Sequence, residues 1–295
     1  MMKKEKKIWL PQIPLYIHVI EINKKIKVMK NVEIQKVVKR GRPAKQVTTS
    51  VFDPSNVKLM RGSELVFNDS LFKPMKTKSE LDVIMSTEGG VMPGTNMVFV
   101  GGPGSGKSTV VLDMLSNFTR QGYKCLFVSG EMDEIAHYKY CQRLPKFACV
   151  QTLFLKNYAD QAKETLEYVF NEGYDIIAID SIAEVIEMVK DNYRMTESAA
   201  EGWFLQLQDQ NKKGMNSKNY YTTFINIQQV TKAGDFAGSN RLKHMTDAMC
   251  HIERSKDGLQ RKLYFSKNRD CDKDFEVFFT IHKDNVYYSY GQVND

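Results

Sequence analysis

The chain between residues 95 and 230 alternates short apolar runs with longer segments of mixed polarity. The apolar runs have the length of buried strands, and the mixed segments repeat apolar residues at helical intervals. Several of the mixed segments end at glycine or just before proline, as helices do. We expect strands at 95–100, 124–130, 148–155, 175–182 and 220–230, and helices at 108–122, 133–144, 160–173 and 197–214.

The pattern changes after residue 247, where strand-like runs follow one another without intervening helices. These runs lie at 248–254, 261–267, 275–282 and 285–290. Alternating strands and helices are typical of a mainly parallel sheet with helices on both faces. Consecutive strands extend such a sheet in antiparallel fashion. The predicted fold is therefore α/β, with C-terminal antiparallel strands.

The first 55 residues lack sustained helical or strand spacing and are predicted to be a basic, largely irregular leader. Residues 1–50 hold 13 Lys/Arg against 3 Asp/Glu, whereas residues 51–295 hold 29 against 32. Within the leader, Arg40-Gly41-Arg42-Pro43 resembles an AT-hook, whose arginines enter the minor groove of A·T-rich DNA. A plain basic linker is an equal alternative. We expect a connecting region at 56–90 and the ATPase core at 91–295.

Composition bears on whether the protein is expected in a membrane, in a secreted form or with a zinc site or disulfides. No run of about 18 apolar residues occurs, so neither a transmembrane helix nor a membrane partner is expected. The N-terminus superficially resembles a signal peptide, but Pro11 and Pro14 interrupt its apolar stretch and no small-residue cleavage site follows. The five cysteines include no Cys-x-x-Cys pair, which argues against a zinc site or a disulfide framework. We expect a cytoplasmic protein with reduced thiols.

One motif indicates a nucleotide. Residues 101–108 match G-x-x-x-x-G-K-[ST], after a predicted strand and before a predicted helix, which is the required context. Backbone N–H groups of such a loop surround phosphates, aided by the helix N-terminus. Lys107 is expected to reach the β and γ phosphates, and Ser108 to bind Mg²⁺. The expected nucleotide-binding residues are Gly101, Gly102, Pro103, Gly104, Ser105, Gly106, Lys107, Ser108 and Thr109.

Two acidic residues complete the expected hydrolytic site. Asp180 ends a buried apolar strand, where P-loop proteins place the acid that holds the metal ion. Glu131 follows the strand after the P-loop helix, a position that can bring a carboxylate beside the γ-phosphate. From the residues alone, an ordinary surface acid at Glu131 is an equal alternative.

Longer segments resemble the RadA/Sms ATPases of the RecA superfamily. The resemblance lies in ELDVIMSTEGGVMPGTNMVFVGGPGSGKST (80–109), FVSGEMDEI (127–135), VTKAGDFAGSNRLKHMTDAMCHIER (230–254) and SKNRD (266–270), and it covers residues 75–282. It implies a RecA-like P-loop ATPase core that uses ATP and Mg²⁺ and forms a homo-oligomeric ring or filament. It also implies binding to single-stranded or branched DNA, in recombination or repair.

The resemblance also implies roles for individual residues. Glu131 matches the catalytic glutamate, and Asp180 matches the metal-side aspartate. Gln229 falls where the family has a histidine and related helicases a glutamine, a position that can sense the γ-phosphate. Lys267 and Arg269 match residues that reach the nucleotide of the neighbouring subunit, where an arginine stabilises transition-state charge.

Two segments are expected to be loops that contact DNA. The first is 187–197, with Lys190 and Arg194 as phosphate contacts and Tyr193 as a base-stacking residue. The second is 231–243, and its candidate contacts are Lys232, Arg241 and Lys243. Mobile surface loops with ordinary charges are the alternative for both.

The chain departs from the family pattern in ways that leave other functions open. Neither the zinc finger nor the C-terminal protease-like domain of the family is expected, and Asp270-Cys271 replaces Phe-Gly after Lys-Asn-Arg. Glu131-Met132 together with Gln229 resembles DnaB-type helicase cores. The alternatives are therefore a DnaB-type replicative helicase and, in another class, a KaiC-like ATPase that regulates protein partners. A small-molecule kinase is disfavoured, because no acceptor-binding pattern is evident.

Overall fold

The computed structural model describes residues 55, 57–230, 239–255, 258, 260–271 and 275–292. The chain divides into two compact units, Met1–Arg61 and Gly62–Asp295. The predicted leader with Arg40 and Arg42, and most of the second predicted DNA loop with Lys232, lie outside the described residues. No helix in the described part is long and apolar enough to span a membrane.

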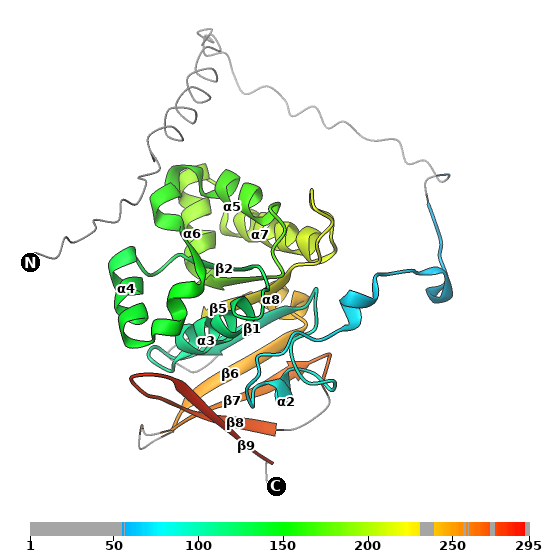
Figure 1. The fold of residues 1–295 in the computed structure, drawn as a ribbon. Coiled ribbons are helices and arrows are strands. Elements are labelled where there is room, and N and C mark those ends of the chain that lie inside the picture. Colours follow the sequence, from blue (N-terminus) through cyan, green and yellow to red (C-terminus); the bar gives the residue numbers. More distant parts are fainter. Residues whose placement is uncertain are drawn as a thin grey trace, which may run out of the picture. The chain divides into compact units, whose positions relative to one another are not determined.

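The second unit is built on a nine-stranded sheet with the order β3-β2-β4-β5-β1-β6-β7-β8-β9 (Figure 1). The first six strands in this order are parallel, and β7, β8 and β9 continue antiparallel. This arrangement confirms the predicted α/β class. The strands are β1 (Asn96–Gly101), β2 (Cys125–Ser129), β3 (Gln151–Phe154), β4 (Ile176–Asp180), β5 (Thr223–Gln229), β6 (Ala248–Arg254), β7 (Arg261–Asn268), β8 (Phe275–Ile281) and β9 (Val286–Gln292).

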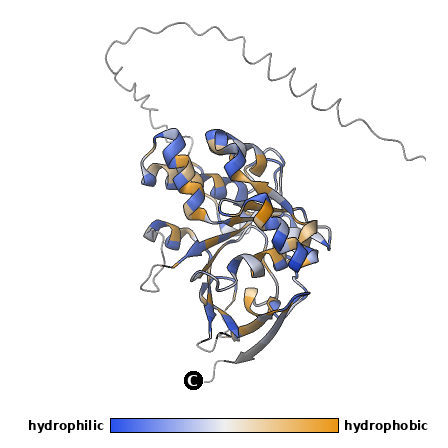
Figure 2. Cartoon of the chain, turned by 90° about the vertical axis from the view of Figure 1, so that its left-hand side faces the viewer, coloured by the Kyte–Doolittle hydropathy of each residue, from blue (hydrophilic) through white to orange (hydrophobic). Residues whose placement is uncertain are grey.

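Helices flank the sheet, and Figure 2 shows hydrophobic and hydrophilic residues on different sides of them. The α-helices are α2 (Asp82–Met85), α3 (Lys107–Thr119), α4 (Glu134–Arg143), α5 (Ala162–Phe170), α6 (Ile182–Tyr193), α7 (Glu197–Lys212) and α8 (Asn240–Met245). Short 3₁₀ helices are η2 (Gly62–Glu64), η3 (Asp69–Phe72), η4 (Pro145–Cys149) and η5 (Leu155–Gln161).

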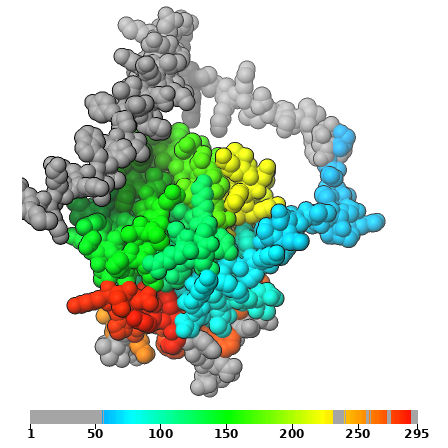
Figure 3. Space-filling model, viewed as in Figure 1, coloured from blue at the N-terminus to red at the C-terminus, as the bar shows by residue number. Residues whose placement is uncertain are grey.

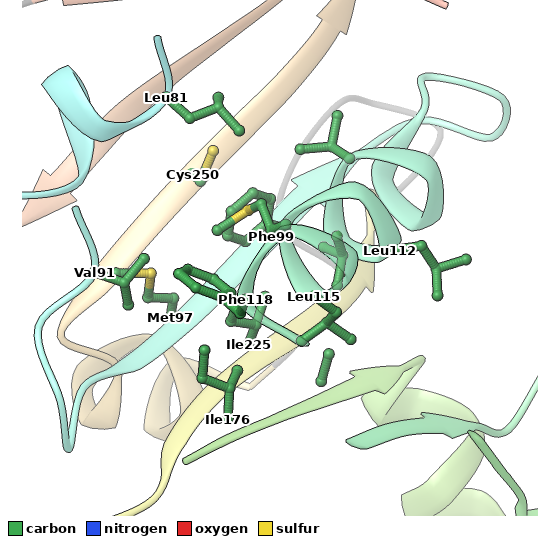
Figure 4. Packing of buried hydrophobic residues seen from close by; sticks show 14 of the residues in the cluster. Leu81, Val91, Met97, Phe99, Leu112, Leu115, Phe118, Ile176, Ile225 and Cys250 are labelled. Carbon is green, nitrogen blue, oxygen red and sulfur yellow. The ribbon is translucent and has the colours of Figure 1, made fainter. Parts of the chain in front are cut away.

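The central strands are buried on both faces, as parallel strands covered by helices must be. Along β1, Met97 and Phe99 face a core that they share with Leu115 and Phe118 of α3 (Figure 4). This core continues over the antiparallel strands, with residues such as Leu263. Figure 3 shows the C-terminal strands, in red, against the cyan segment that precedes β1.

The opposite face of the sheet carries a second core. Leu126 of β2, Ile177 of β4 and Phe224 of β5 pack there with residues of α5, α6 and α7, such as Phe204. Each fully buried side chain of this size contributes about 1.5–3 kcal/mol relative to an exposed one. Successive side chains of each central strand point to opposite faces of the sheet, so α3 covers one apolar face and α5, α6 and α7 cover the other.

A buried ion pair ties the C-terminal strands to α3. Asp113 of α3 is 1% exposed and pairs with Lys146 of η4. The Lys146 ammonium also donates to Asn285 Oδ1 at 2.6 Å, in the turn between β8 and β9. Burial raises the pKa of Asp113, and the lysine opposes that rise. Lys146 thus joins three elements that are distant in sequence.

Two local predictions were wrong. Most of the expected loop at 187–197 is helical, because α6 continues to Tyr193 and only 194–196 connect it to α7. Ile182, Val185 and Val189 recur at helical spacing and are buried, so packing holds this segment as a helix. The expected strand at 148–155 begins later, at Gln151, because η4 occupies its first residues.

Candidate nucleotide site

The phosphate-binding loop joins the end of β1 to the start of α3. Gly104 and Gly106 have φ angles of 71° and 107°, which residues with a Cβ rarely adopt. A Cβ on Gly106 would lie 3.3 Å from Arg261 Cδ and from Phe279 Cε2, so the loop also passes close to β7 and β8. Glycine at this position satisfies both the backbone angle and the close approach.

Lys107 is the first residue of α3 and is 8% exposed. Its ammonium group donates to the carbonyl oxygens of Gly101 at 2.7 Å and Gly102 at 3.0 Å. Burial lowers the pKa of Lys107, while Asp180 and Glu131 oppose the change. These contacts hold a cation at the mouth of the loop, where a phosphate would replace weak carbonyl partners with a stronger anionic one.

Ser108 and Asp180 bring two oxygens together beside the loop. Ser108 Oγ donates to Asp180 Oδ2 at 2.5 Å, although 72 residues separate them in sequence. Asp180 ends β4 and is 3% exposed, and burial raises its pKa to about 6. A hydroxyl and a carboxylate beside a phosphate loop form the oxygen donor set that Mg²⁺ takes. The two residues therefore fit the metal ion predicted from the sequence.

Glu131 and Gln229 form a second polar pair next to Asp180. The Gln229 amide nitrogen donates to Glu131 Oε1 at 3.3 Å, and the Glu131 N–H donates to the carbonyl oxygen of Asp180 at 3.2 Å. Because β4 lies between β2 and β5, the ends of these three parallel strands meet at one edge of the sheet. The structure thus gathers Lys107, Ser108, Asp180, Glu131 and Gln229 around one cavity of about 420 Å³.

The same cavity has further lining residues that the sequence interpretation missed. They are Tyr140 and Arg143 of α4, Arg261 at the start of β7, and Ile281 at the end of β8. An antiparallel strand that follows β6 must return from the phosphate edge, so its first residue begins near the loop. That rule of topology was available from the sequence and could have identified Arg261.

Lys267 and Arg269 lie at the opposite end of β7 from Arg261. The Arg269 guanidinium bonds to Asp247 Oδ1 at 3.1 Å, and its side chain is 61% exposed. The Lys267 ammonium donates to the backbone carbonyls of Thr246 and, at 3.3 Å, Lys243. Seven residue steps of about 3.4 Å separate the two ends of β7 by about 24 Å. These two cations therefore do not line the nucleotide cavity of their own subunit.

The candidate DNA contacts among the described residues lie on helices or at helix ends. Lys190 pairs with Glu187 on α6, and Arg194 follows that helix with φ of 51°. The Tyr193 hydroxyl donates to Glu164, and partial burial with this bond raises its pKa to about 12. Arg241 and Lys243 belong to α8, and Arg241 approaches Gly202 of α7.

Comparison with known proteins finds relatives in the same family that the sequence resembles. No protein-family model matches the chain. DNA repair protein RadA of Campylobacter jejuni is 32% identical over 197 residues, which is 65% of this chain and 40% of that protein. DNA repair protein RadA of Helicobacter pylori J99 is 30% identical over 206 residues, 68% of this chain and 43% of that protein. The chain spans about two-fifths of the length of these relatives.

A solved structure gives the same answer for the fold. The crystal structure of the RadB recombinase superposes with a TM-score of 0.54 at 16% identity, covering 74% of this chain and 99% of that chain. The predicted RecA-like architecture and the resemblance to RadA are both confirmed.

Proposed function

We propose that this chain, whose core is a RadA-like core of the RecA superfamily, is a recombination or repair ATPase. It would hydrolyse ATP as an oligomer on single-stranded or branched DNA. The observation that carries the proposal is the convergence of Lys107, Ser108, Asp180, Glu131 and Gln229 on one cavity. The curated relatives named DNA repair protein RadA support the choice of process.

Each of these side chains has a chemical part in hydrolysis. Lys107 balances the charge of the β and γ phosphates, and Ser108 and Asp180 would hold Mg²⁺, which neutralises charge that develops on the phosphate oxygens. Glu131 accepts a hydrogen bond from Gln229, so its carboxylate is oriented. An oriented carboxylate can position water and take its proton. Gln229 is the last residue of β5, so the strand end holds the amide that contacts Glu131.

Lys267 and Arg269 are proposed to act on the nucleotide of a neighbouring subunit. Their distance from the cavity of their own subunit and the 61% exposure of Arg269 support this role. Arg269 is held by Asp247 at 3.1 Å, so assembly would exchange this partner for a phosphate. Hydrolysis would then depend on oligomer formation, as it does wherever an arginine is supplied in trans.

The first test measures ATP hydrolysis with no DNA and with single-stranded, duplex and forked DNA, together with the mass of the assembly. We expect single-stranded or forked DNA to increase the rate, and Lys107→Ala to remove nucleotide binding. Glu131→Gln should retain binding and lose turnover. A rate that no DNA changes would contradict the proposal and favour a regulator of protein partners.

The second test concerns action between subunits. Arg269→Ala should bind ATP normally and lose DNA-stimulated turnover, and mixing it with Lys107→Ala should recover activity in mixed assemblies. Arg120→Ala is the matched control, because Arg120 caps α3 on the exposed surface and does not line the cavity. Normal hydrolysis by Arg269→Ala alone would refute the trans role.

A further inference from the structure

The turn that carries Glu131 is closed by one side chain. Ser129 is the last residue of β2, and its hydroxyl contacts both backbone polar groups of Met132. The Met132 N–H donates to Ser129 Oγ at 3.0 Å, and Ser129 Oγ donates to the carbonyl oxygen of Met132 at 2.9 Å. A hydroxyl can make both bonds because it has one hydrogen and two lone pairs. Glu131 lies within the turn that these bonds close, so its direction depends on them.

The strands on either side of β2 hold the backbone of Glu131. Its N–H donates to the carbonyl oxygen of Asp180 at 3.2 Å, and the Gly130 N–H donates to the same oxygen at 2.7 Å. On the other side, the Lys156 ammonium donates to the carbonyl oxygen of Glu131 at 3.1 Å. Asp180 ends β4, Lys156 lies in η5 directly after β3, and β2 lies between these two strands. The turn is therefore anchored to both neighbours of β2.

Ser129 is buried between these strands and has no direct access to the nucleotide. It is 1% exposed and pairs in register with Asp180 of β4 and Phe154 of β3. Glu131 and Met132 line the nucleotide cavity, whereas Ser129 is not among its lining residues. Removing the hydroxyl would leave two backbone groups of Met132 without their partner, and unpaired buried groups are costly. The turn would have to change its conformation to pair them again.

We propose that Ser129 is a positioning residue for hydrolysis, which holds Glu131 where its carboxylate can orient the attacking water. This inference rests on the proposed role of Glu131 and adds the residue on which the position of Glu131 depends. Gln229 contacts the carboxylate from the end of β5, whereas Ser129 fixes the backbone that carries it. A general base must lie within hydrogen-bond reach of the water, so a small shift of this backbone lowers turnover.

The test compares Ser129→Ala with the wild type in kcat and KM for DNA-stimulated ATP hydrolysis and, by calorimetry, in the dissociation constant of ADP. We expect kcat to fall by at least about tenfold, because a displacement of about 1 Å can cost about 10²-fold. KM and the dissociation constant should change by less than about twofold, since an interaction made in the transition state is lost. Lys107 and Ser108 keep their own contacts in this variant.

Ser116→Ala is the matched control for stability. Ser116 is also buried, and its Oγ donates to the carbonyl oxygen of Leu112 at 2.6 Å within α3. Both alanine variants lose a buried hydrogen-bonding hydroxyl, so urea unfolding should show similar losses of stability. Ser116→Ala should nevertheless keep the wild-type kcat, because its hydroxyl contacts α3 itself and not the turn at Glu131.

Two further variants separate the hydroxyl from the volume that it fills. Ser129→Thr keeps a hydroxyl on the same Cβ and should retain at least about half of the wild-type kcat. Ser129→Cys fills a similar volume with a weak donor and acceptor, so its kcat should fall as in Ser129→Ala. Circular dichroism checks that each variant is folded, and Ser129→Cys supplies the result if Ser129→Ala does not fold.

Three results would overturn the inference. A wild-type kcat in Ser129→Ala would show that the position of Glu131 does not depend on Ser129. Equal losses of kcat in Ser129→Ala and Ser116→Ala would show a general effect of stability. A loss in Ser129→Thr as large as in Ser129→Ala would show that volume matters and the hydroxyl does not. Each of these leaves Glu131→Gln inactive, whereas normal turnover by Glu131→Gln would refute the proposed hydrolytic role of Glu131 itself.

Discussion

Asp180 is expected to hold the metal ion. Because its carboxylate is buried, we expect it to destabilise the protein when the metal is absent. It is 3% exposed, and burial raises its pKa from the ordinary 3.8 to about 6. Burial is the largest cause of this rise in pKa, and the nearby charge of Glu131 contributes to it, whereas the hydrogen bond from Ser108 and the charge of Lys107 oppose it. Replacing Asp180 with asparagine removes the buried charge and keeps an oxygen for Ser108.

The magnitude follows from proton linkage. One pKa unit corresponds to about 1.4 kcal/mol, so a rise from 3.8 to about 6 amounts to an upper value of about 3 kcal/mol. Between these pH values the folded state binds more protons at Asp180 than the unfolded state. The contribution of this group to stability therefore falls as pH rises through this range, and the full cost is present above about pH 6.

The assay is urea unfolding of the wild type and Asp180→Asn in the presence of a chelator, at pH 7.5 and near pH 4. At pH 7.5, we expect the free energy of unfolding of Asp180→Asn to be about 1–3 kcal/mol higher than that of the wild type. Near pH 4, most of this difference should disappear. It should also lose metal-dependent hydrolysis. Asp175→Asn, at the other end of β4, is the control and should not gain stability. A pH-independent gain, or a loss of stability at pH 7.5, would refute the reasoning.

Two further predictions concern the buried Asp113–Lys146 ion pair and the basic leader. Lys146→Met leaves Asp113 buried without its cation and should lower the free energy of unfolding by about 3–5 kcal/mol, measured with urea. Lys213→Met breaks an exposed pair and should cost less than about 1 kcal/mol, and equal losses in both variants would contradict the argument. Deletion of residues 1–55 should weaken duplex binding at low salt and flatten its salt dependence, measured by fluorescence anisotropy, with little change in DNA-free hydrolysis. An unchanged salt dependence would make the leader a spacer.

Much of the fold could be predicted because apolar runs and glycine positions are local signals. The phosphate loop needs only neighbouring residues, and the apolar strand that ends at Asp180 marks one sheet edge by itself. The pairing of Ser108 with Asp180 then follows from parallel topology. The roles of Lys267 and Arg269 remain predictions, since they depend on a second subunit.

The parts that the sequence did not reveal depend on tertiary packing. Arg143 of α4 and Arg261 of β7 come from separate elements, and only the folded chain brings both to the same cavity. The helix at Ile182–Tyr193 was predicted to be a loop over much of its length, because the prediction relied on Lys190 and Tyr193 rather than on the buried residues that precede them, such as Val185 and Val189. Apolar spacing was the more informative signal in that segment.

The length of β7 has a consequence for assembly. The strand begins at Arg261, beside one nucleotide site, and Arg269 follows its last residue. Because Arg269 is proposed to reach the next site, the length of β7 would set the distance between successive sites. Removing two residues from its middle would keep the inward and outward alternation of side chains while shortening it by about 7 Å. Such a chain would retain its core yet place Arg269 out of register with its neighbour. Insertions and deletions in β7 should therefore affect cooperativity between subunits before they affect folding.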